Sequence, residues 1–214
     1  MLPNIGAITL DTAVEGVRKY NRGFYRRRPN IDLDRSASDM FHDGLGSTLE
    51  KIGQQVRFIG NDYGGAAGFR KALSIAPDIA NAIFASRENY ASAIARARPL
   101  IESLPSRESV AFLCKPFIQP CEGKRNWLVW GTKFWHFLNP EAFPIEDSRV
   151  DSFFKLAWNQ DPVKRYLVMM HAFREFALTH EAWVPALRAA DEDFSSVNKL
   201  WDKVFFGVRE PQAC

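Results

Sequence analysis

The chain has 214 residues, of which 46% are hydrophobic and 13% aromatic, and its formal net charge is +3. This length suits one large domain or two smaller ones, and the apolar content is sufficient for a hydrophobic core. No uncharged apolar run is long enough to span a membrane, and the N-terminus lacks the pattern of a signal peptide. The mildly basic balance permits nucleic-acid binding but does not require it.

The three cysteines, Cys114, Cys121 and Cys214, do not form an even disulfide framework, and their spacing does not match a zinc site. We therefore expect reduced thiols, a cytoplasmic location, and neither a metal nor another cofactor.

The first predicted helix begins at the capping box Thr12-x-x-Glu15 and ends in the basic segment Arg26–Pro29. Val14, Val17 and Phe24 are expected on its buried side. The densest basic cluster of the chain lies in the second half of this predicted helix. It consists of Arg18, Lys19, Arg22, Arg26, Arg27 and Arg28, interleaved with Tyr20, Phe24 and Tyr25. Arginine fits phosphate groups and aromatic rings stack on bases, which predicts a nucleic-acid-binding surface. The alternative is a cationic helix end favoured by the helix dipole.

An acid-rich segment, residues 30–43, follows the basic cluster. Its carboxylates are Asp32, Asp34, Asp39 and Asp43. Calcium-loop spacing is absent, so we expect surface acids that pair with the nearby arginines.

Ser47 or Thr48 is predicted to begin the next helix, which places Leu49, Ile52, Val56 and Ile59 on one face. The glycines of "GNDYGGAAGFR" then form a loop before a further helix. Such a loop can receive a phosphate at the helix N-terminus, but a plain interhelical turn is favoured.

Residues 69–104 have a helical, alanine-rich pattern with Pro77 in a first turn, a new start near Ser86 and an interruption at Pro99. Leu104-Pro105-Ser106 is the best candidate boundary, which divides the chain into subdomains 1–104 and 105–214. The segment "SVAFLCKPFIQP" is either a short buried helix or an extended segment.

The most sharply patterned stretch begins at Asn126, which can cap a helix that carries an aromatic arc. Lys133 and His136 lie on the remaining sector, three residues apart and therefore adjacent on the helix surface. Asn139-Pro140 ends this helix. An extended connector, "FPIEDSRV", then brings Glu146 and Asp147 to the start of the next helix.

The segment "FPIEDSRV" resembles the "FPVDTHV" segment of the helix-hairpin-helix DNA glycosylase superfamily. That family has a lysine on the preceding helix and an aspartate at the start of the following one. The resemblance implies that Lys133 is a nucleophile for the sugar C1′ and that Asp147 stabilises the cationic sugar or positions the amine. His136 and Glu146 would lie nearby. Of the family's glycine-rich hairpin, only Gly123 and Gly131 are candidates here.

The same stretch is also similar to a group of small helical proteins of unassigned activity, with a "K…hNPe.fPIyDs.v" core and a C-terminal "lDk.lW" helix. The C-terminal segment "NKLWDKVFFG" fits that second pattern. Ser195 or Ser196 is predicted to begin this last helix, and Gly207 to end it as a C′ glycine. Asp161-Pro162 is predicted to cap an earlier helix of this half of the chain.

Capped segments with a period near 3.6 residues dominate, so we expect an all-α fold of about eight to ten helices, with a cleft between two subdomains. Three functions remain open. The first is a DNA-acting enzyme that uses Lys133, Asp147, His136 and Glu146, with Lys19, Arg22 and Arg26–Arg28 on the nucleic acid. The second is a helical module that binds nucleic acid or protein without catalysis. The third is a small-molecule enzyme with a pocket on the Lys133/His136 face.

Overall fold

The structure is a computed structural model that describes residues 8–25, 28–63, 72–118, 128–154, 156, 161–193 and 195–208. The fold is all-α, as the sequence predicts. The helices in chain order are α1 (Leu10–Arg22), α2 (Asn30–Phe41), α3 (Leu49–Asn61), η2 (Ala72–Ile75), α4 (Ala76–Ala85), α5 (Arg87–Arg96), α6 (Arg107–Ile118), α7 (Leu128–Leu138), α8 (Ser148–Phe154), α9 (Pro162–Thr179), η4 (Glu181–Trp183), α10 (Val184–Ala190) and α11 (Val197–Gly207).

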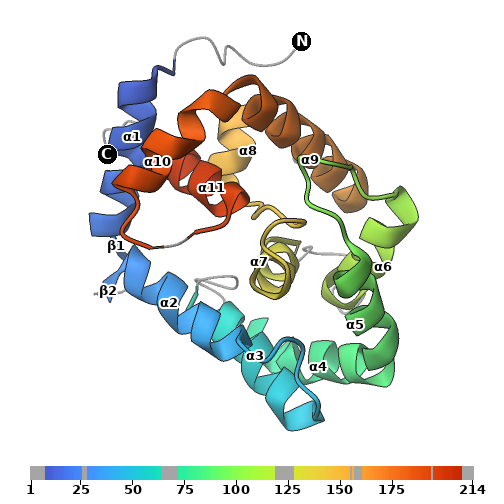
Figure 1. Cartoon of the computed structure of the whole chain (residues 1–214). Coiled ribbons are helices and arrows are strands. Elements are labelled where there is room, and N and C mark those ends of the chain that lie inside the picture. Colours follow the sequence, from blue (N-terminus) through green and yellow to red (C-terminus); the bar gives the residue numbers. More distant parts are fainter. Residues whose placement is uncertain are drawn as a thin grey trace.

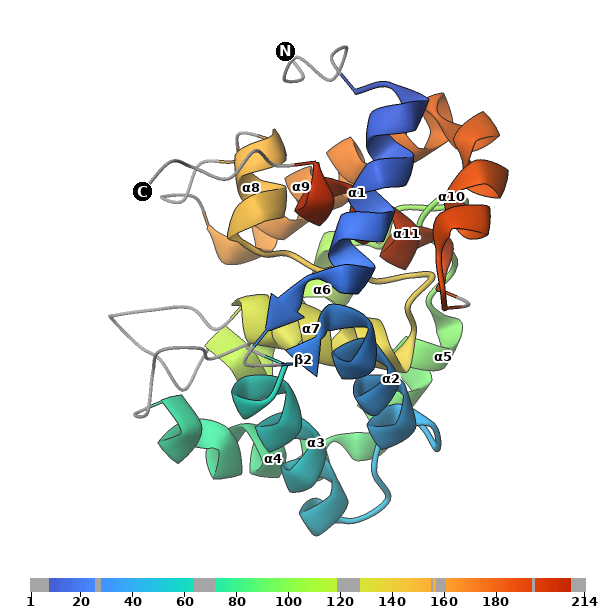
Figure 2. The same cartoon turned by 90° about the vertical axis from the view of Figure 1, so that its left-hand side faces the viewer.

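Helix α7 is the centre of the arrangement, and the other helices surround it (Figure 1). In the second view, α1 and α8 to α11 lie on one side of α7, and α2 to α5 lie on the other (Figure 2). Helix α6 contacts α4, α7 and α9. Burial of large side chains stabilises α7 in this central position, since Trp130, Phe134 and Trp135 are almost fully buried. The two indole N–H groups donate to the carbonyl oxygens of Val56 and Leu113, each at 2.9 Å.

The first and last helices of the chain pack against each other, because α1 contacts both α10 and α11. The boundary at 104/105 stays a prediction. Its consequence would be a fold in which α1 of the first subdomain is packed on α11 of the second.

Three helix starts are confirmed by their capping side chains. Thr48 accepts a hydrogen bond from the backbone N–H of Lys51 at 3.2 Å, Asp161 from Lys164 at 2.8 Å, and Ser196 from Lys199 at 3.1 Å. The face predicted for α3 is right for Ile52, Val56 and Ile59, which are fully buried, but wrong for Leu49, which is 40% exposed.

The prediction for the first helix is wrong at both ends. Thr9, not Thr12, is the N-cap, and its hydroxyl accepts from the Thr12 N–H at 3.3 Å. The helix ends at Arg22, because Gly23 leaves the helical conformation. The chain then forms a short antiparallel pair, β1 (Phe24–Tyr25) and β2 (Arg28–Pro29), instead of continuing as a helix. The buried side includes Val17, as predicted, with Ala13 and Tyr20.

Two glycines have other roles than the predicted ones. Gly207 is the last residue of α11 rather than a C′ residue, and a Cβ there would overlap the backbone of Gly16 on α1. Gly131 is not part of a hairpin; it lies inside α7, where a Cβ would be 2.9 Å from the Phe117 ring. Both glycines allow close helix crossings.

The segment with two open interpretations, "SVAFLCKPFIQP", is helical up to Ile118, and Pro116 lies within α6. Several predicted features lie outside the described residues: Arg26, Arg27, Gly64, Gly65, Gly68, Cys121, Gly123, Asn126, Trp127 and Cys214.

Candidate functional site

The connector between α7 and α8, residues 139–147, is fixed by hydrogen bonds to three helices or helix ends. Asn139 ends α7. Its side-chain amide donates to the carbonyl oxygen of Ile94, within the last turn of α5, and to that of Ala97, just beyond the end of α5. The amide of Asn198 on α11 donates to the Pro140 carbonyl at 2.9 Å and to that of Glu141 at 2.8 Å. The two segments that carry the second resemblance therefore lie against each other.

Thr132 joins the far end of this connector to α7. The Glu146 N–H donates to the Thr132 hydroxyl at 3.1 Å, and the carbonyl oxygen of Glu146 lies 3.4 Å from the same hydroxyl. Thr132 is fully buried, so this contact is shielded from water. The residues that follow these two are Lys133 and Asp147, and their backbones are consequently brought together.

Lys133 and Asp147 are both half-buried. The Lys133 amine lies 5.4 Å from the centroid of the Tyr63 ring, within the range of a cation–π contact. The Asp147 carboxylate accepts from the Val150 N–H at 3.1 Å and caps α8, as predicted.

His136 is enclosed, with 1% of its surface exposed. Its Nδ1 is 2.7 Å from the Phe143 carbonyl oxygen, so this nitrogen carries the proton and donates. Burial lowers the pKa of His136 to about 3, and the nearby charge of Lys199 adds to the shift. The ring is therefore neutral near pH 7 and holds the connector against α7. Its predicted role in catalysis stays a prediction, and its enclosure favours a structural role.

Glu146 is also fully buried, and it pairs with Arg165 of α9 through a hydrogen bond of 2.7 Å from Nε. Asp151, one turn into α8, is buried beside this pair, and neither of its carboxylate oxygens has a hydrogen-bond partner in the structure as described. Burial raises the pKa of Glu146 to about 8, the charge of Asp151 adds to this rise, and Arg165 opposes it. Burial likewise raises the pKa of Asp151 to about 6.

A second ionic cluster, which we call the Lys199 network, was not predicted from the sequence. It consists of Tyr20, Asp34, Tyr63, Lys199 and Asp202. The Lys199 amine donates to the hydroxyls of Tyr20 and Tyr63 at 3.0 and 2.9 Å and to Asp202 at 2.8 Å, and it lies 3.3 Å from Asp34. Both tyrosine hydroxyls donate to Asp34. All five residues are buried.

The Lys199 network places one buried amine against two buried carboxylates. Burial alone would lower the pKa of Lys199, but the carboxylates of Asp202 and Asp34 outweigh it and hold this pKa above its ordinary value. The prediction that the acids of residues 30–43 are surface acids is therefore wrong for Asp34, which is 4% exposed.

The Lys199 network adjoins both predicted catalytic residues. Tyr63 is the ring over which the Lys133 amine lies. The negative charge of Asp147 contributes to the raised pKa of Asp202, after the larger effect of burial. Lys133 thus contacts this buried polar cluster from α7, and the charge of Asp147 acts on the same cluster from the start of α8. The sequence signal that could have revealed it is the pair Lys199 and Asp202 within the apolar helix "NKLWDKVFFG".

The basic cluster is at the surface where it is described. Lys19 and Arg28 are exposed. The Arg22 side chain is 68% exposed and lies 3.8 Å from Glu15. These cations lie at the end of α1 and in β2.

Comparisons with protein-family models, with curated proteins and with solved structures found no match to this chain. Among the helices that the structure describes, none combines the length and apolar character needed to cross a lipid bilayer. Cys114 is buried and is a free cysteine.

Proposed function

We propose that the chain acts on DNA and cleaves an N-glycosidic bond, with Lys133 as the nucleophile and Asp147 as the assisting carboxylate. The observation that supports this most is the Thr132–Glu146 contact, which joins the positions immediately before Lys133 and Asp147 across 14 positions of the chain. Both side chains are half-buried, so each retains some access to solvent.

In the proposed reaction the neutral Lys133 amine attacks C1′ of the nucleotide sugar. A C1′–N bond to lysine forms, the bond from C1′ to the base breaks, and the base leaves with the electron pair and takes up a proton. Asp147 stabilises the positive charge that develops on the sugar in the transition state. The lysine nitrogen then loses a proton and the C1′–O4′ bond breaks, with O4′ taking up a proton, so that an imine links the opened sugar to the lysine. Water later hydrolyses this imine and releases the enzyme.

Borohydride trapping tests the lysine chemistry. The protein is incubated with duplexes that contain an abasic site or a deaminated, oxidised or alkylated base, and the imine is reduced to a stable adduct. We expect an adduct with the unmodified chain and none with Lys133→Ala. The matched control is Lys115→Ala, which removes an exposed lysine of α6 and should leave trapping unchanged.

Release of the base must be measured in the same reactions, because an enzyme that uses water instead of lysine forms no adduct. If base release persists in Lys133→Ala and falls in Asp147→Asn, the chemistry is hydrolytic and the role given to Lys133 is wrong. If no substrate yields an adduct or a free base, the proposal of glycosidic cleavage is wrong.

A second candidate is a nucleic-acid-binding module without catalysis, favoured by the exposed cations Lys19, Arg22 and Arg28. Removal of a phosphate contact weakens binding. It also reduces the slope of the logarithm of the binding constant against the logarithm of the salt concentration by about 1 per contact. This candidate predicts that the double variant Arg22→Ala/Arg28→Ala weakens DNA binding, while Lys133→Ala leaves it unchanged.

The third predicted class, a small-molecule enzyme with a pocket on the Lys133/His136 face, is less well supported. His136 is enclosed by packing and is committed to the Phe143 carbonyl.

A further inference from the structure

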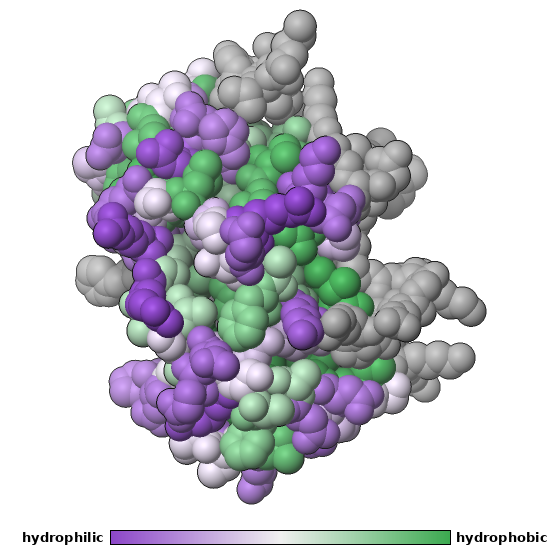
Figure 3. Space-filling view, turned by 90° about the vertical axis from the view of Figure 1, so that its right-hand side faces the viewer, coloured by the Kyte–Doolittle hydropathy of each residue, from purple (hydrophilic) through white to green (hydrophobic). Residues whose placement is uncertain are grey.

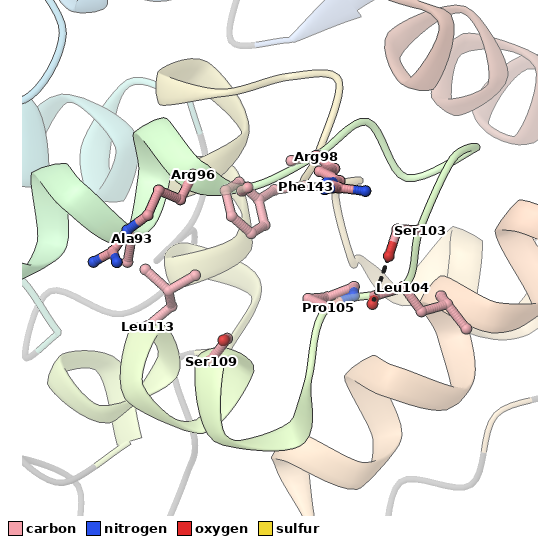
Figure 4. Close-up of a pocket in the computed structure, with 11 residues that line it drawn as sticks. Ala93, Arg96, Arg98, Ser103, Leu104, Pro105, Ser109, Leu113 and Phe143 are labelled. Atoms are coloured by element: carbon pink, nitrogen blue, oxygen red, sulfur yellow. Dashed lines mark hydrogen bonds between the residues drawn. The ribbon is translucent and has the colours of Figure 1, made fainter.

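A cavity lies apart from the proposed site, between the end of α5, the start of α6 and the connector (Figure 4). Its volume is about 500 Å³, which is in the range of pockets that hold small molecules. Neither Lys133 nor Asp147 is among its lining residues.

The inner walls of the cavity are apolar. Leu113, Ala142 and Phe143 line it and are 2 or 3% exposed. Figure 4 shows the Phe143 ring, Leu113 and Ser109 turned toward the same space, from the connector and from α6. A flat aromatic ring beside an aliphatic side chain is a suitable surface for an aromatic or other planar apolar group.

The rim of the cavity is cationic. Arg96 and Arg98 belong to its lining and lie on opposite sides of Phe143 in Figure 4, whereas the lining residues that the structure describes include no Asp or Glu. The Arg96 Nε donates to the Ser92 carbonyl at 3.2 Å and one Nη donates to the Ser92 hydroxyl at 2.6 Å, which fixes the side chain and leaves further N–H groups for a ligand. Arg98 is exposed and makes no hydrogen bond or ion pair with any residue that the structure describes.

The cavity is held open by structure on both sides. The Leu100 N–H donates to the Glu141 carbonyl at 2.8 Å, and the Asn139 amide bonds to the end of α5. Because the protein's own backbone and side chains make these contacts, binding requires little ordering of the protein.

From the apolar walls, the two arginines and the absence of acids in the lining, we propose that this cavity binds a small organic anion: a carboxylate or phosphate group carried on an aromatic ring. The ring occupies the space between Phe143 and Leu113, and the oxyanion accepts hydrogen bonds from the arginines at the rim. The surrounding face favours a small ligand over a protein partner, because hydrophobic residues there are interspersed with hydrophilic ones (Figure 3).

Titration calorimetry on the full chain tests this proposal with three probes of similar size. These are 1-naphthyl phosphate, 2-naphthoate and the neutral 2-naphthol. We expect saturable binding of at least one of the two anions and at least tenfold weaker binding of the neutral compound. The anion that binds more tightly distinguishes a phosphate site from a carboxylate site.

Three variants connect binding to the cavity. Arg96→Gln/Arg98→Gln removes the cationic rim and should weaken anion binding at least tenfold. Ser109→Phe fills the cavity from an exposed position on α6 and should abolish binding without disturbing the core. Arg87→Gln removes a charge of α5 that pairs with Glu88 outside the cavity, and it should leave binding unchanged.

The proposal is overturned if neither anion binds at concentrations on the order of 1 mM, which corresponds to a binding free energy near −4 kcal/mol. It is also overturned if 2-naphthol binds as tightly as the anions, or if the Ser109→Phe protein binds them as tightly as the unmodified chain. Circular dichroism and thermal unfolding establish that each variant is folded, so that lost binding is not mistaken for lost structure.

Discussion

At the scale of single residues, the Lys199 network joins buried charges that depend on one another. A buried group that loses one of its hydrogen-bond partners costs about 1–3 kcal/mol, even where a second partner remains. Asp34 faces Lys199, Tyr20 and Tyr63 in the interior, whereas Asp32, two residues before it, is 49% exposed and lies 4.0 Å from Arg35.

We therefore predict that Asp34→Asn lowers the free energy of unfolding by about 1–3 kcal/mol, because Lys199 loses one carboxylate but keeps Asp202. Asp32→Asn on the same helix should change it by no more than about 0.5 kcal/mol, because exposed ion pairs contribute little. Urea denaturation of both variants measures the difference. Equal effects of the two substitutions would show that Asp34 does not balance a buried charge.

The buried carboxylates Glu146 and Asp151 should make the stability of the folded protein depend on pH. One arginine, Arg165, cannot neutralise both, and the pKa of Asp151 is raised to about 6 against an ordinary value of 3.8. Between these two values the folded state binds more protons than the unfolded state, so this group's contribution to stability falls as the pH rises.

Asp151→Asn keeps the neutral form of this side chain at every pH. The variant should therefore match the unmodified chain near about pH 4 and exceed its stability by about 1–2 kcal/mol near about pH 7.5, with allowance for residual solvent screening. Denaturation curves at the two pH values provide the comparison. A variant that is less stable than the unmodified chain at the higher pH would mean that Asp151 is ionised and satisfied in the folded protein.

At the scale of elements, the crossing of α1 and α11 depends on two glycines. A Cβ at Gly16 would lie 3.0 Å from a Val208 methyl carbon and 3.2 Å from the Val204 carbonyl, and one at Gly207 would meet the backbone of Gly16. The backbone of a helix cannot shift as a flexible side chain can, so the helices would have to separate.

Gly207→Ala should consequently destabilise the protein by about 2–3 kcal/mol, in the range of an overpacked core. Gly53→Ala in α3 is the matched control, because its Cβ would meet only the Ala80 Cβ at 4.0 Å. There the better helix propensity of alanine should stabilise the protein by about 0.5–1 kcal/mol. Thermal unfolding of both variants gives the sign of each change. A stabilising Gly207→Ala substitution would contradict the close crossing.

Local sequence signals predicted the helix starts that depend only on neighbouring residues. Thr48, Asp161 and Ser196 each cap a helix through an N–H three residues later, and Asn139-Pro140 ends α7 where the chain must turn. Thr9 was missed because Thr12 and Glu15 offered an alternative capping pattern one turn later. Such competition between adjacent caps is decided by packing rather than by the local sequence.

At the scale of the whole molecule, the all-α class followed from helical periodicity, but the site's surroundings did not. Lys199 lies 179 positions after Tyr20 and 136 after Tyr63 in the sequence, so no local pattern indicates that these residues form one cluster. The acids of residues 30–43 look alike in sequence, and only the fold distinguishes the buried Asp34 from its exposed neighbours. Lys133 and Asp147 could be singled out because the segment "FPIEDSRV" resembles that of a known family, and because only the connector, residues 139–147, separates their helices.

The proposal that Lys133 and Asp147 act in the same chemical step is tested most directly by a double-mutant cycle that measures the rate of base release in a single turnover. When two residues act together in one step, removing either one already abolishes their joint effect, so removing both slows the step no further. We therefore predict that Lys133→Gln and Asp147→Asn each slow base release at least about a hundredfold, and that the double variant is no slower than the slower single variant. Two single effects that simply multiply in the double variant, or single variants as fast as the unmodified chain, would contradict the joint action of this lysine and this carboxylate.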